Sequence, residues 1–313
     1  MYIGIDLGGT NIAAGLVNDA GEILYKDKVK TNPDRHYSEI VRDMAELSKE
    51  VAHSGGVSLD KIKWVGVGSP GTCDCERGVL IFTNNINFYN TPMKEEFVKH
   101  FDLPFYLEND ANCAALGEAL LGGGRGTKNS VTITIGTGIG SGIIIDGKIM
   151  TGFNHAGGEL GHTIIVADGE KCSCGNNGCW EAYASATALI RQTKAAMERD
   201  KSSLMWELAR VKETSARTAF EAAHAGDAAA AHVVEKYIYY LSVGILNVVN
   251  IFQPEKLLIG GGVSGEGEYI LEPIRKFIKE RDYYKGENKA KIEKAQLGND
   301  AGIIGAAMLG MQN

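Results

Sequence analysis

The sequence predicts an α/β fold with two domains. Its 313 residues exceed what one hydrophobic core usually fills. Residues 2–29 and residues 131–149 each read as an apolar strand, a glycine turn and a second strand, and helical patterns separate them. This repeated plan indicates an internally duplicated architecture with one phosphate-binding loop in each half.

The first of these units predicts a pair of β-hairpins, because residues 2–29 alternate apolar and polar positions around glycine turns. Its first turn combines an acid at the end of a strand with glycines, a hydroxyl and an amide: Asp6, Gly8, Gly9, Thr10 and Asn11. Glycines let backbone N–H groups face an anion, Thr10 adds a donor, and Asp6 can hold Mg²⁺ through water. A plain hairpin turn fits the same residues equally well.

The second unit repeats the plan and favours the phosphate loop. Residues 131–149 place a glycine turn at 136–138 between two apolar strands. Neither common nucleotide-binding fingerprint is present, because Ser141 stands where G-x-G-x-x-G needs its last glycine and residues 126–128 do not form a Walker A ending. The sequence therefore disfavours the Rossmann and P-loop folds.

The rest of the chain alternates helical and strand patterns. An amphipathic helix at 38–52 precedes a strand at 62–67 that runs into a turn at 68–71. Ser69 in this turn lacks the G-x-S-x-G spacing of a nucleophile elbow, so a hydrolase has no support. Thr91 and Pro92 are expected to begin a short helix as its N-cap and first residue. Further strands are predicted at 104–107 and 256–259, and further helices at 113–123, 182–199, 204–211, 216–225, 228–252 and 301–311.

The strand at 256–259 enters a run of glycines at 260–262. Adjacent glycines let a flat ring lie on the backbone, which suits an adenosine. A plain turn fits this run nearly as well.

Asn109 and Asp110 stand between the strand at 104–107 and an alanine-rich helix. The default role of an Asn or Asp at this point is to cap the helix. The competing role is catalytic, since an Asp at a strand-to-helix junction can accept a proton from a substrate hydroxyl that attacks phosphorus. The segment alone leaves both roles open.

Residues 152–181 carry the most specific signal. His162, Cys172, Cys174 and Cys179 follow the spacing His-x9-Cys-x-Cys-x4-Cys, which is typical of tetrahedral zinc. An isolated cysteine is commonly a buried thiol, but three cysteines so close together among turn-forming residues favour a metal site. A set of four protein ligands leaves no position for an activated water, so we predict a structural Zn²⁺.

Two carboxylates flank these ligands, because Glu159 precedes His162 and Glu181 follows Cys179. A ligating imidazole uses its second nitrogen for an outer hydrogen bond. The metal would therefore present Glu159, Glu181 and the free edge of His162 to a neighbouring ligand. Carboxylates fixed in this way suit a polyhydroxy compound.

The composition argues against two classes of partner. The net charge is −7 and no long basic run occurs, which argues against nucleic acid and anionic lipid. Neither a leader pattern nor an apolar span of about 18 residues is present, so we expect a cytoplasmic protein without membrane contact. In a reducing compartment Cys73, Cys75 and Cys113 are expected to be thiols, and the sequence assigns them no role.

Five motifs match one known family: IDLGGTN at 5–11, ENDAN at 108–112, IGTGIGSG at 135–142, AGGELGH at 156–162 and CSCGNNGCWE at 172–181. The chain thus resembles the ROK family of bacterial sugar kinases and repressors. The resemblance implies an actin-like, ribonuclease-H-like fold, in which two α/β domains with mixed sheets close over ATP and sugar in an interdomain cleft, and it implies a homodimer. For this chain it implies a small domain of residues 1–115 plus 300–313 and a large domain of residues 116–299.

The resemblance also implies roles for individual residues, with Asp110 as the catalytic base. The sugar-binding residues would be Pro70, Gly71, Asn109, Asp110, Glu159, His162 and Glu181. The nucleotide-binding loops would contain Gly8, Gly9, Thr10, Asn11, Gly136, Thr137, Gly138, Gly261 and Gly262. The zinc ligands would be His162, Cys172, Cys174 and Cys179. Small departures from the family stand at Ser141, where a glycine is common, at Trp180, where an aliphatic residue is usual, and at Phe88, where relatives often carry Trp.

The expected activity is transfer of the γ-phosphoryl group of MgATP to the 6-hydroxyl of glucose, the first step of glycolysis. ATP, Mg²⁺ and structural Zn²⁺ are the implied cofactors. One alternative is a ROK kinase for another hexose, such as fructose, mannose, allose or an N-acetylhexosamine. Another is a sugar-sensing regulator without turnover, which the lack of a DNA-binding region before Met1 disfavours. A third, a zinc-stabilised interaction module, leaves both phosphate loops unexplained.

Overall fold

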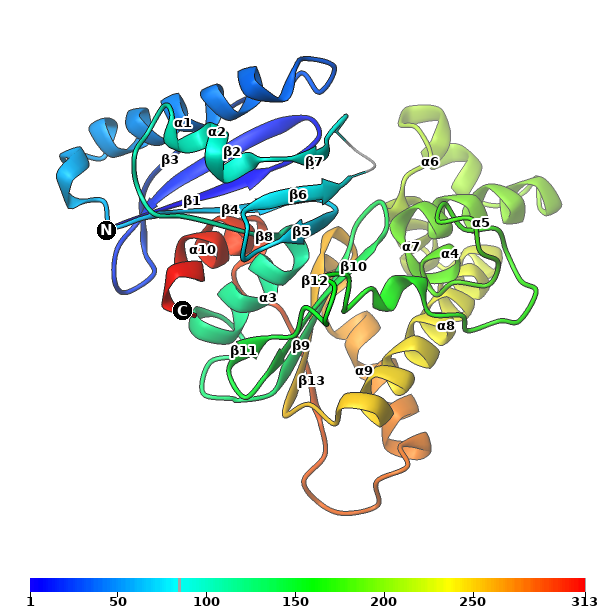
Figure 1. Ribbon diagram of the computed structural model, residues 1–313. Helices are drawn as coiled ribbons and strands as arrows, with labels where there is room; N and C mark the ends of the chain where they lie inside the picture. The colour runs from blue at the N-terminus through cyan, green and yellow to red at the C-terminus, as the bar shows by residue number, and fades with distance from the viewer. Residues whose placement is uncertain (84–85, 313) are drawn as a thin grey trace. The chain divides into compact units, whose positions relative to one another are not determined.

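The computed structural model describes residues 1–83 and 86–312 (Figure 1). The chain forms two units. The first comprises Met1–Thr132, Gly142–Gly158 and Gln296–Asn313, and the second comprises Ile133–Ser141 and Glu159–Ala295. The functional domains predicted from the sequence, 1–115 plus 300–313 and 116–299, have other boundaries and stay a prediction.

The first unit contains a mixed sheet of five strands in the order β3-β2-β1-β4-β8. These strands are β1 (Tyr2–Leu7), β2 (Asn11–Val17), β3 (Ile23–Lys30), β4 (Val65–Ser69) and β8 (Phe105–Asn109). The first three strands pair antiparallel, which confirms the predicted hairpins, whereas β1, β4 and β8 run parallel. The helices of this unit are α1 (Tyr37–Ser54), α2 (Met93–Val98), α3 (Asp110–Leu121) and α10 (Ala301–Met308).

Helices cover both faces of this sheet, with α1 on one face and α10 and α3 on the other (Figure 1). The alternation of β1 explains the two layers, because Ile3 and Ile5 enter the core shared with α1 while Tyr2 enters the core shared with α10. Strands β1 and β4 approach α10 very closely. A Cβ atom at Gly4 or Gly66 would lie 1.9 or 1.8 Å from a carbonyl oxygen of α10, so both positions require glycine.

A small antiparallel sheet follows β4 and was not predicted. It consists of β5 (Thr72–Asp74), β6 (Val79–Phe82) and β7 (Tyr89–Thr91), in the order β5-β6-β7. Thr91 ends β7, so its predicted role as the N-cap of the next helix is wrong. Helix α2 begins at Met93 with Pro92 at the cap position and no side-chain capping bond.

The second five-stranded sheet has the order β11-β10-β9-β12-β13. Its strands are β9 (Ser130–Ile135), β10 (Ile139–Ile145), β11 (Lys148–Ile149), β12 (Lys256–Gly261) and β13 (Lys291–Lys294). Strands β9 and β10 with the turn between them confirm the second predicted strand, glycine turn, strand unit. Strand β13, which pairs parallel with β12, was not predicted.

Helices make up most of the second unit. They are α4 (Glu181–Ala184), α5 (Ala186–Arg199), α6 (Met205–Val211), α7 (Ala216–His224), α8 (Ala228–Phe252) and α9 (Glu268–Arg281). Helix α8 packs against α5, α7 and α9 and buries Tyr237, as expected of a core helix. The single helix predicted at 182–199 is wrong, because Ser185 ends α4 and caps α5 through its hydroxyl. Helix α9, which contains Pro273, was missed.

Short 3-10 turns lie between these elements and at the end of the chain, at Leu59–Lys61, Leu160–His162, Gly262–Glu266, Gly298–Asp300 and Leu309–Met311. The last of these replaces the end of the helix predicted at 301–311. Within the described residues, none of the helices combines the length and the apolar character that crossing a membrane requires.

Candidate active site

The hydrogen bonds of Asn109, at the end of β8, show which residue caps α3. The Asn109 side-chain oxygen accepts hydrogen bonds from the backbone N–H groups of Ala111 and Asn112, at 2.9 and 3.2 Å. Asn109 is therefore the N-cap, and Asp110 is the first helical residue. Because Asn109 does the capping, Asp110 is available for chemistry at the start of the helix.

The loop after β4 lies beside this turn. The side-chain amide nitrogen of Asn109 donates to the carbonyl oxygen of Gly71 at 3.0 Å. Gly71 has a φ of 93°, and a Cβ atom there would lie 2.0 Å from the carbonyl oxygen of Phe82. The structure thus brings together four of the predicted sugar-site residues in the first unit: Pro70, Gly71, Asn109 and Asp110.

Asp6 at the end of β1 belongs to the same region. Its strand is separated from β8 only by β4, and all three run parallel, so their carboxyl ends share one edge of the sheet. Burial raises the pKa of Asp6 to about 6, and the negative charge of Asp110 adds to the shift. Burial also raises the pKa of Asp110, although the N–H of Ala111 offsets part of this effect. The two acids therefore lie near each other and hold protons more tightly than ordinary aspartates.

The first glycine turn is a closed hairpin connection between β1 and β2. The N–H of Gly8 donates to the carbonyl oxygen of Asn11 at 3.0 Å. The hydroxyl of Thr31 donates to the carbonyl oxygen of Gly8 at 2.6 Å, which ties the turn to the end of β3. The predicted residues Gly8, Gly9, Thr10 and Asn11 thus form one turn that follows Asp6 directly.

The second glycine turn, residues 136–138, lies in the second unit and is held by one hydrogen bond within the turn and by two from other segments. The N–H of Gly136 donates to the carbonyl oxygen of Gly138 at 3.0 Å, and the hydroxyl of Thr187 donates to the carbonyl oxygen of Thr137 at 2.7 Å. The Glu181 carboxylate accepts from the N–H of Ile139 at 2.8 Å. The start of α5 and the carboxylate of Glu181 therefore fix the conformation of this loop.

The four predicted metal ligands come together in the second unit. One ligand atom from each of His162, Cys172, Cys174 and Cys179 lies within 4.8 Å of all the others. Three cysteine sulfurs and one imidazole nitrogen are the donors that zinc prefers, and four such donors form a tetrahedral set. These residues fit a structural Zn²⁺.

The thiols of this cluster are not equivalent. The backbone N–H of Asn176 holds the pKa of Cys174 below its usual range, whereas burial raises the pKa of Cys179 to about 12. A bound metal would deprotonate both thiols. Metal binding is therefore expected to release protons and to depend on pH.

Glu181 links the metal cluster to the second glycine turn. One carboxylate oxygen accepts from Ile139, and the other lies 3.3 Å from the hydroxyl of Ser173 and 3.9 Å from the sulfur of Cys172. Glu159 is exposed and directly precedes the 3-10 turn that carries His162. The structure thus groups His162 and Glu181 at the cluster and places Glu159 at the start of the same segment.

The predicted adenosine loop stands at the end of β12. Gly261 has a φ of 81°, and a Cβ atom there would lie 2.3 Å from the carbonyl oxygen of Ile135. The Ser264 hydroxyl donates to the carbonyl oxygen of Gly261 at 2.7 Å, and Gly262 begins a 3-10 turn. Gly261 is thus required by its backbone, which is compatible with both a turn and a nucleotide contact.

A sequence model described as the ROK family matches residues 2–313. The chain belongs to the ROK family. A glucokinase from Halalkalibacterium halodurans is 37% identical over 310 residues, which cover 98% of this chain and 94% of that relative. A xylose repressor from Caldicellulosiruptor bescii is 31% identical over 305 residues, which cover 97% of this chain and 76% of the repressor.

A solved structure supports the same assignment. A ROK family glucokinase from Streptomyces griseus, in complex with glucose and AMPPNP, matches with a TM-score of 0.83 and 36% identity, over 100% of this chain and 99% of that chain. The two mixed sheets of this ROK protein therefore belong to the actin-like ATPase fold, which confirms the predicted fold class.

The structure adds a residue to this ROK site that the sequence had treated only as a departure from the family. The hydroxyl oxygen of Ser141 accepts a hydrogen bond from the N–H of Leu160 at 3.1 Å. Ser141 thus supports the segment that carries Glu159 and His162. The available signal was a hydroxyl in place of an expected glycine, which indicates a position with room for a side chain.

Proposed function

We propose that this ROK protein is an ATP-dependent glucokinase, which transfers the γ-phosphoryl group of MgATP to the 6-hydroxyl of glucose. The observation that carries the proposal is that two neighbouring residues at the start of α3 differ in role. Asn109 caps the helix, and Asp110 keeps a carboxylate at its first position with a raised pKa. The names of the glucokinase relatives support glucose as the acceptor.

Asp110 acts as the base. In a loose phosphoryl-transfer transition state the enzyme mainly positions the reactants and neutralises charge, so the base orients the hydroxyl and accepts its proton. A carboxylate whose pKa is raised by burial accepts a proton more readily than an ordinary aspartate. Asp110 would therefore take the proton of the 6-hydroxyl as its oxygen attacks the γ-phosphorus.

The glycine turns bind the triphosphate. Backbone N–H groups of Gly8–Asn11 and of Gly136–Gly138 would face the phosphate oxygens, and Thr10 would add a hydroxyl donor. Mg²⁺ bound with the nucleotide supplies neutralisation of the phosphate charge, and Asp6 would hold it through water. Gly261 and Gly262 would lie against the adenosine.

Sugar selectivity comes from charged and amide groups. Asn109, Glu159, His162 and Glu181 would bind glucose hydroxyls, beside Pro70 and Gly71. Hydrogen bonds to charged groups are worth about 1.5–3 kcal/mol each, and a site that pairs hydroxyls rejects analogues that lack them. A structural Zn²⁺ held by His162, Cys172, Cys174 and Cys179 would keep the loop in shape without taking part in the reaction.

We include a homodimer and a cytoplasmic location in this proposal. The free thiols Cys73, Cys75 and Cys113 are consistent with a reducing compartment. Light scattering of the purified protein tests the dimer, and a monomer at micromolar concentration would refute it.

An ADP-release assay across a panel of sugars tests the function. We expect the highest kcat/KM with glucose, ahead of fructose, mannose, allose and N-acetylhexosamines. A higher value with another hexose would keep the sugar kinase and change its substrate. The xylose repressor relative favours a second candidate, a sugar-binding regulator, and glucose binding without turnover of any sugar would establish that candidate instead.

A further inference from the structure

Glu108 places a buried carboxylate next to the proposed base. It lies in β8, pairs with Gly68 of β4 and is 6% exposed. One of its oxygens accepts from the backbone N–H of Asn109 at 2.8 Å and from the side-chain amide of Asn112 at 2.9 Å. Glu108 thus binds both ends of the turn that contains Asp110.

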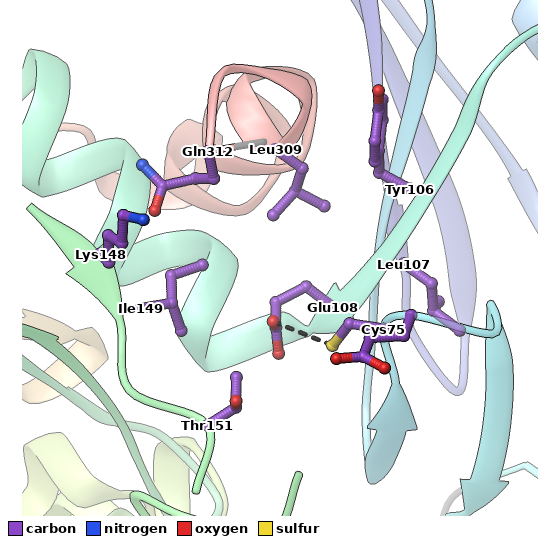
Figure 2. A pocket seen from close by; sticks show the side chains of 10 residues that line it. Cys75, Tyr106, Leu107, Glu108, Lys148, Ile149, Thr151, Leu309 and Gln312 are labelled. Carbon is purple, nitrogen blue, oxygen red and sulfur yellow. Dashed lines mark hydrogen bonds between the residues drawn. The ribbon is translucent and has the colours of Figure 1, made fainter. Parts of the chain in front are cut away.

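The other oxygen of Glu108 accepts from a thiol. The Cys75 sulfur lies 3.1 Å from it, and Figure 2 shows the two side chains facing each other across the end of β8. The sulfur also lies 3.4 Å from the carbonyl oxygen of Cys73. Every partner of the Glu108 carboxylate named here is a donor, so the carboxylate acts as an acceptor at both oxygens.

This contact forms part of the wall of a cavity of about 210 Å³ in the first unit. The cavity is lined by both side chains and by residues from β8, β11 and the C-terminal segment, among them Leu107, Lys148, Ile149 and Leu309 (Figure 2). A cavity of this size holds several waters. Glu108 and Cys75 therefore border a space that has room for water.

The charge of Glu108 makes these hydrogen bonds important. Among the described residues no cation forms a salt bridge with it, and a buried carboxylate without a cation depends on its donors. Burial and the charge of Glu108 raise the pKa of Cys75 far above its usual range. Cys75 therefore stays a neutral donor and is a poor nucleophile.

We propose that Cys75 is a positioning residue, which acts through Glu108 to hold Asn109 and Asp110 in the geometry needed for phosphoryl transfer. The inference rests on the proposed kinase function, because its main readout is turnover. It assigns a role to the second cysteine of the Cys73-x-Cys75 pair, which the sequence left without one.

Three substitutions at Cys75 separate the donor from the volume. Cys75→Ser keeps a donor, Cys75→Ala lets a cavity water replace it, and Cys75→Val places methyl groups against the carboxylate with no donor. We expect kcat/KM for glucose to stay within about threefold of wild type in Cys75→Ser, to fall several-fold in Cys75→Ala and to fall roughly tenfold or more in Cys75→Val.

Two further readouts distinguish positioning from general destabilisation. The KM for ATP should stay unchanged in all three variants, because the effect of Cys75 passes through Glu108 to the turn at Asn109–Asn112. Cys73→Ala is the matched control, since Cys73 is 1% exposed and its side chain packs in the core of the first unit. This control should lower the melting temperature and leave kcat and both KM values unchanged.

Hydrogen exchange gives a test that does not depend on turnover. The amides of Asn109, Ala111 and Asn112 should exchange faster in Cys75→Val than in Cys75→Ser or Cys73→Ala. A folded Cys75→Val with wild-type kcat/KM and wild-type exchange would overturn the inference, and so would a Cys75→Ser as impaired as Cys75→Val. A wild-type protein that phosphorylates no sugar would refute the proposed function instead, and the exchange experiment would then decide the positioning role alone.

Discussion

The turn at Asn109–Asn112 and the loop from Glu159 to Glu181 hold their side chains in place by different means. The turn joins a sheet strand to a helix, and its side chains satisfy its own backbone N–H groups. The loop has one 3-10 turn and isolated β-bridges, and most of its residues before Gly178 are exposed. The ligand atoms of four of its side chains, the predicted metal ligands, lie within 4.8 Å of one another.

The difference shows which parts of the site need a cofactor to be ordered. A turn between a buried strand and a helix can be rigid on its own, because regular structure and capping satisfy its polar groups. A loop that buries few apolar side chains gains its order from the free energy of metal binding. Proton transfer should therefore depend on hydrogen bonds in the first unit, and sugar selectivity on a metal in the second.

The largest expected effect comes from the proposed base. Asp110→Asn should lower kcat by about 10²- to 10⁴-fold, as expected for the loss of a general base, while the fold is retained because Asn109 still caps α3. Steady-state kinetics and circular dichroism check both parts. A near-normal kcat would remove Asp110 from this role.

Loss of a metal ligand should affect the loop from Glu159 to Glu181 and weaken glucose binding. Cys172→Ser should raise the KM for glucose by roughly 10- to 100-fold through disorder of the loop that carries Glu159 and Glu181. Zinc content by mass spectrometry should fall in parallel, and chelation of the wild-type protein should give the same change. An unchanged KM in a zinc-free protein would show that the loop orders itself without metal.

Glu181 should connect the two kinds of substrate. Glu181→Ala should raise the KM for both glucose and ATP, each by roughly tenfold, because the carboxylate binds the N–H that follows the second glycine turn. Initial rates with each substrate varied in turn measure the two constants. An effect on glucose alone would mean that the contact with Ile139 does not position the phosphate loop.

The pH dependence should be smaller and should reflect the first unit. Because the pKa of Asp6 is raised to about 6 and that of Asp110 is raised as well, kcat/KM should fall as the pH drops below about 6, rather than near the lower value of an ordinary aspartate. For stability the sign is opposite. The folded state holds the proton of Asp6 more tightly than the unfolded chain does, so the contribution of Asp6 to stability is greatest at low pH and is lost as the pH rises through about 6.

Removing one acid should also affect the other. In Asp110→Asn the pKa of Asp6 should fall, since the charge of Asp110 contributes to its shift. Titration of the Asp6 carboxyl by nuclear magnetic resonance measures this, and an unchanged value would place the two acids too far apart to interact.

Local patterns predicted much of the fold. Alternation identified β1, β2 and β3, helical periodicity identified α1 and α8, and cysteine spacing identified the metal cluster. The strands β5, β6 and β7 escaped because they have only three or four residues each, too few for a periodic signal. The break at Ser185 escaped because helix-forming residues stand on both sides of it.

The site was less predictable where it depends on tertiary contacts. The choice between Asn109 and Asp110 as the cap needed side-chain geometry, since both residue types cap helices equally well. The contact of Cys75 with Glu108 depends on a sheet that the sequence did not reveal. The proximity of Asp6 and Asp110 depends on the strand order β1-β4-β8, which no local pattern encodes.

Calorimetric titration of glucose into Asp110→Asn and Cys172→Ser tests most directly whether the two regions have separate tasks. We expect Asp110→Asn to bind glucose with a Kd within a few-fold of wild type although its kcat is about 10²- to 10⁴-fold lower, and Cys172→Ser to lose most of its affinity for glucose. Loss of glucose binding in Asp110→Asn together with full binding in Cys172→Ser would contradict the account.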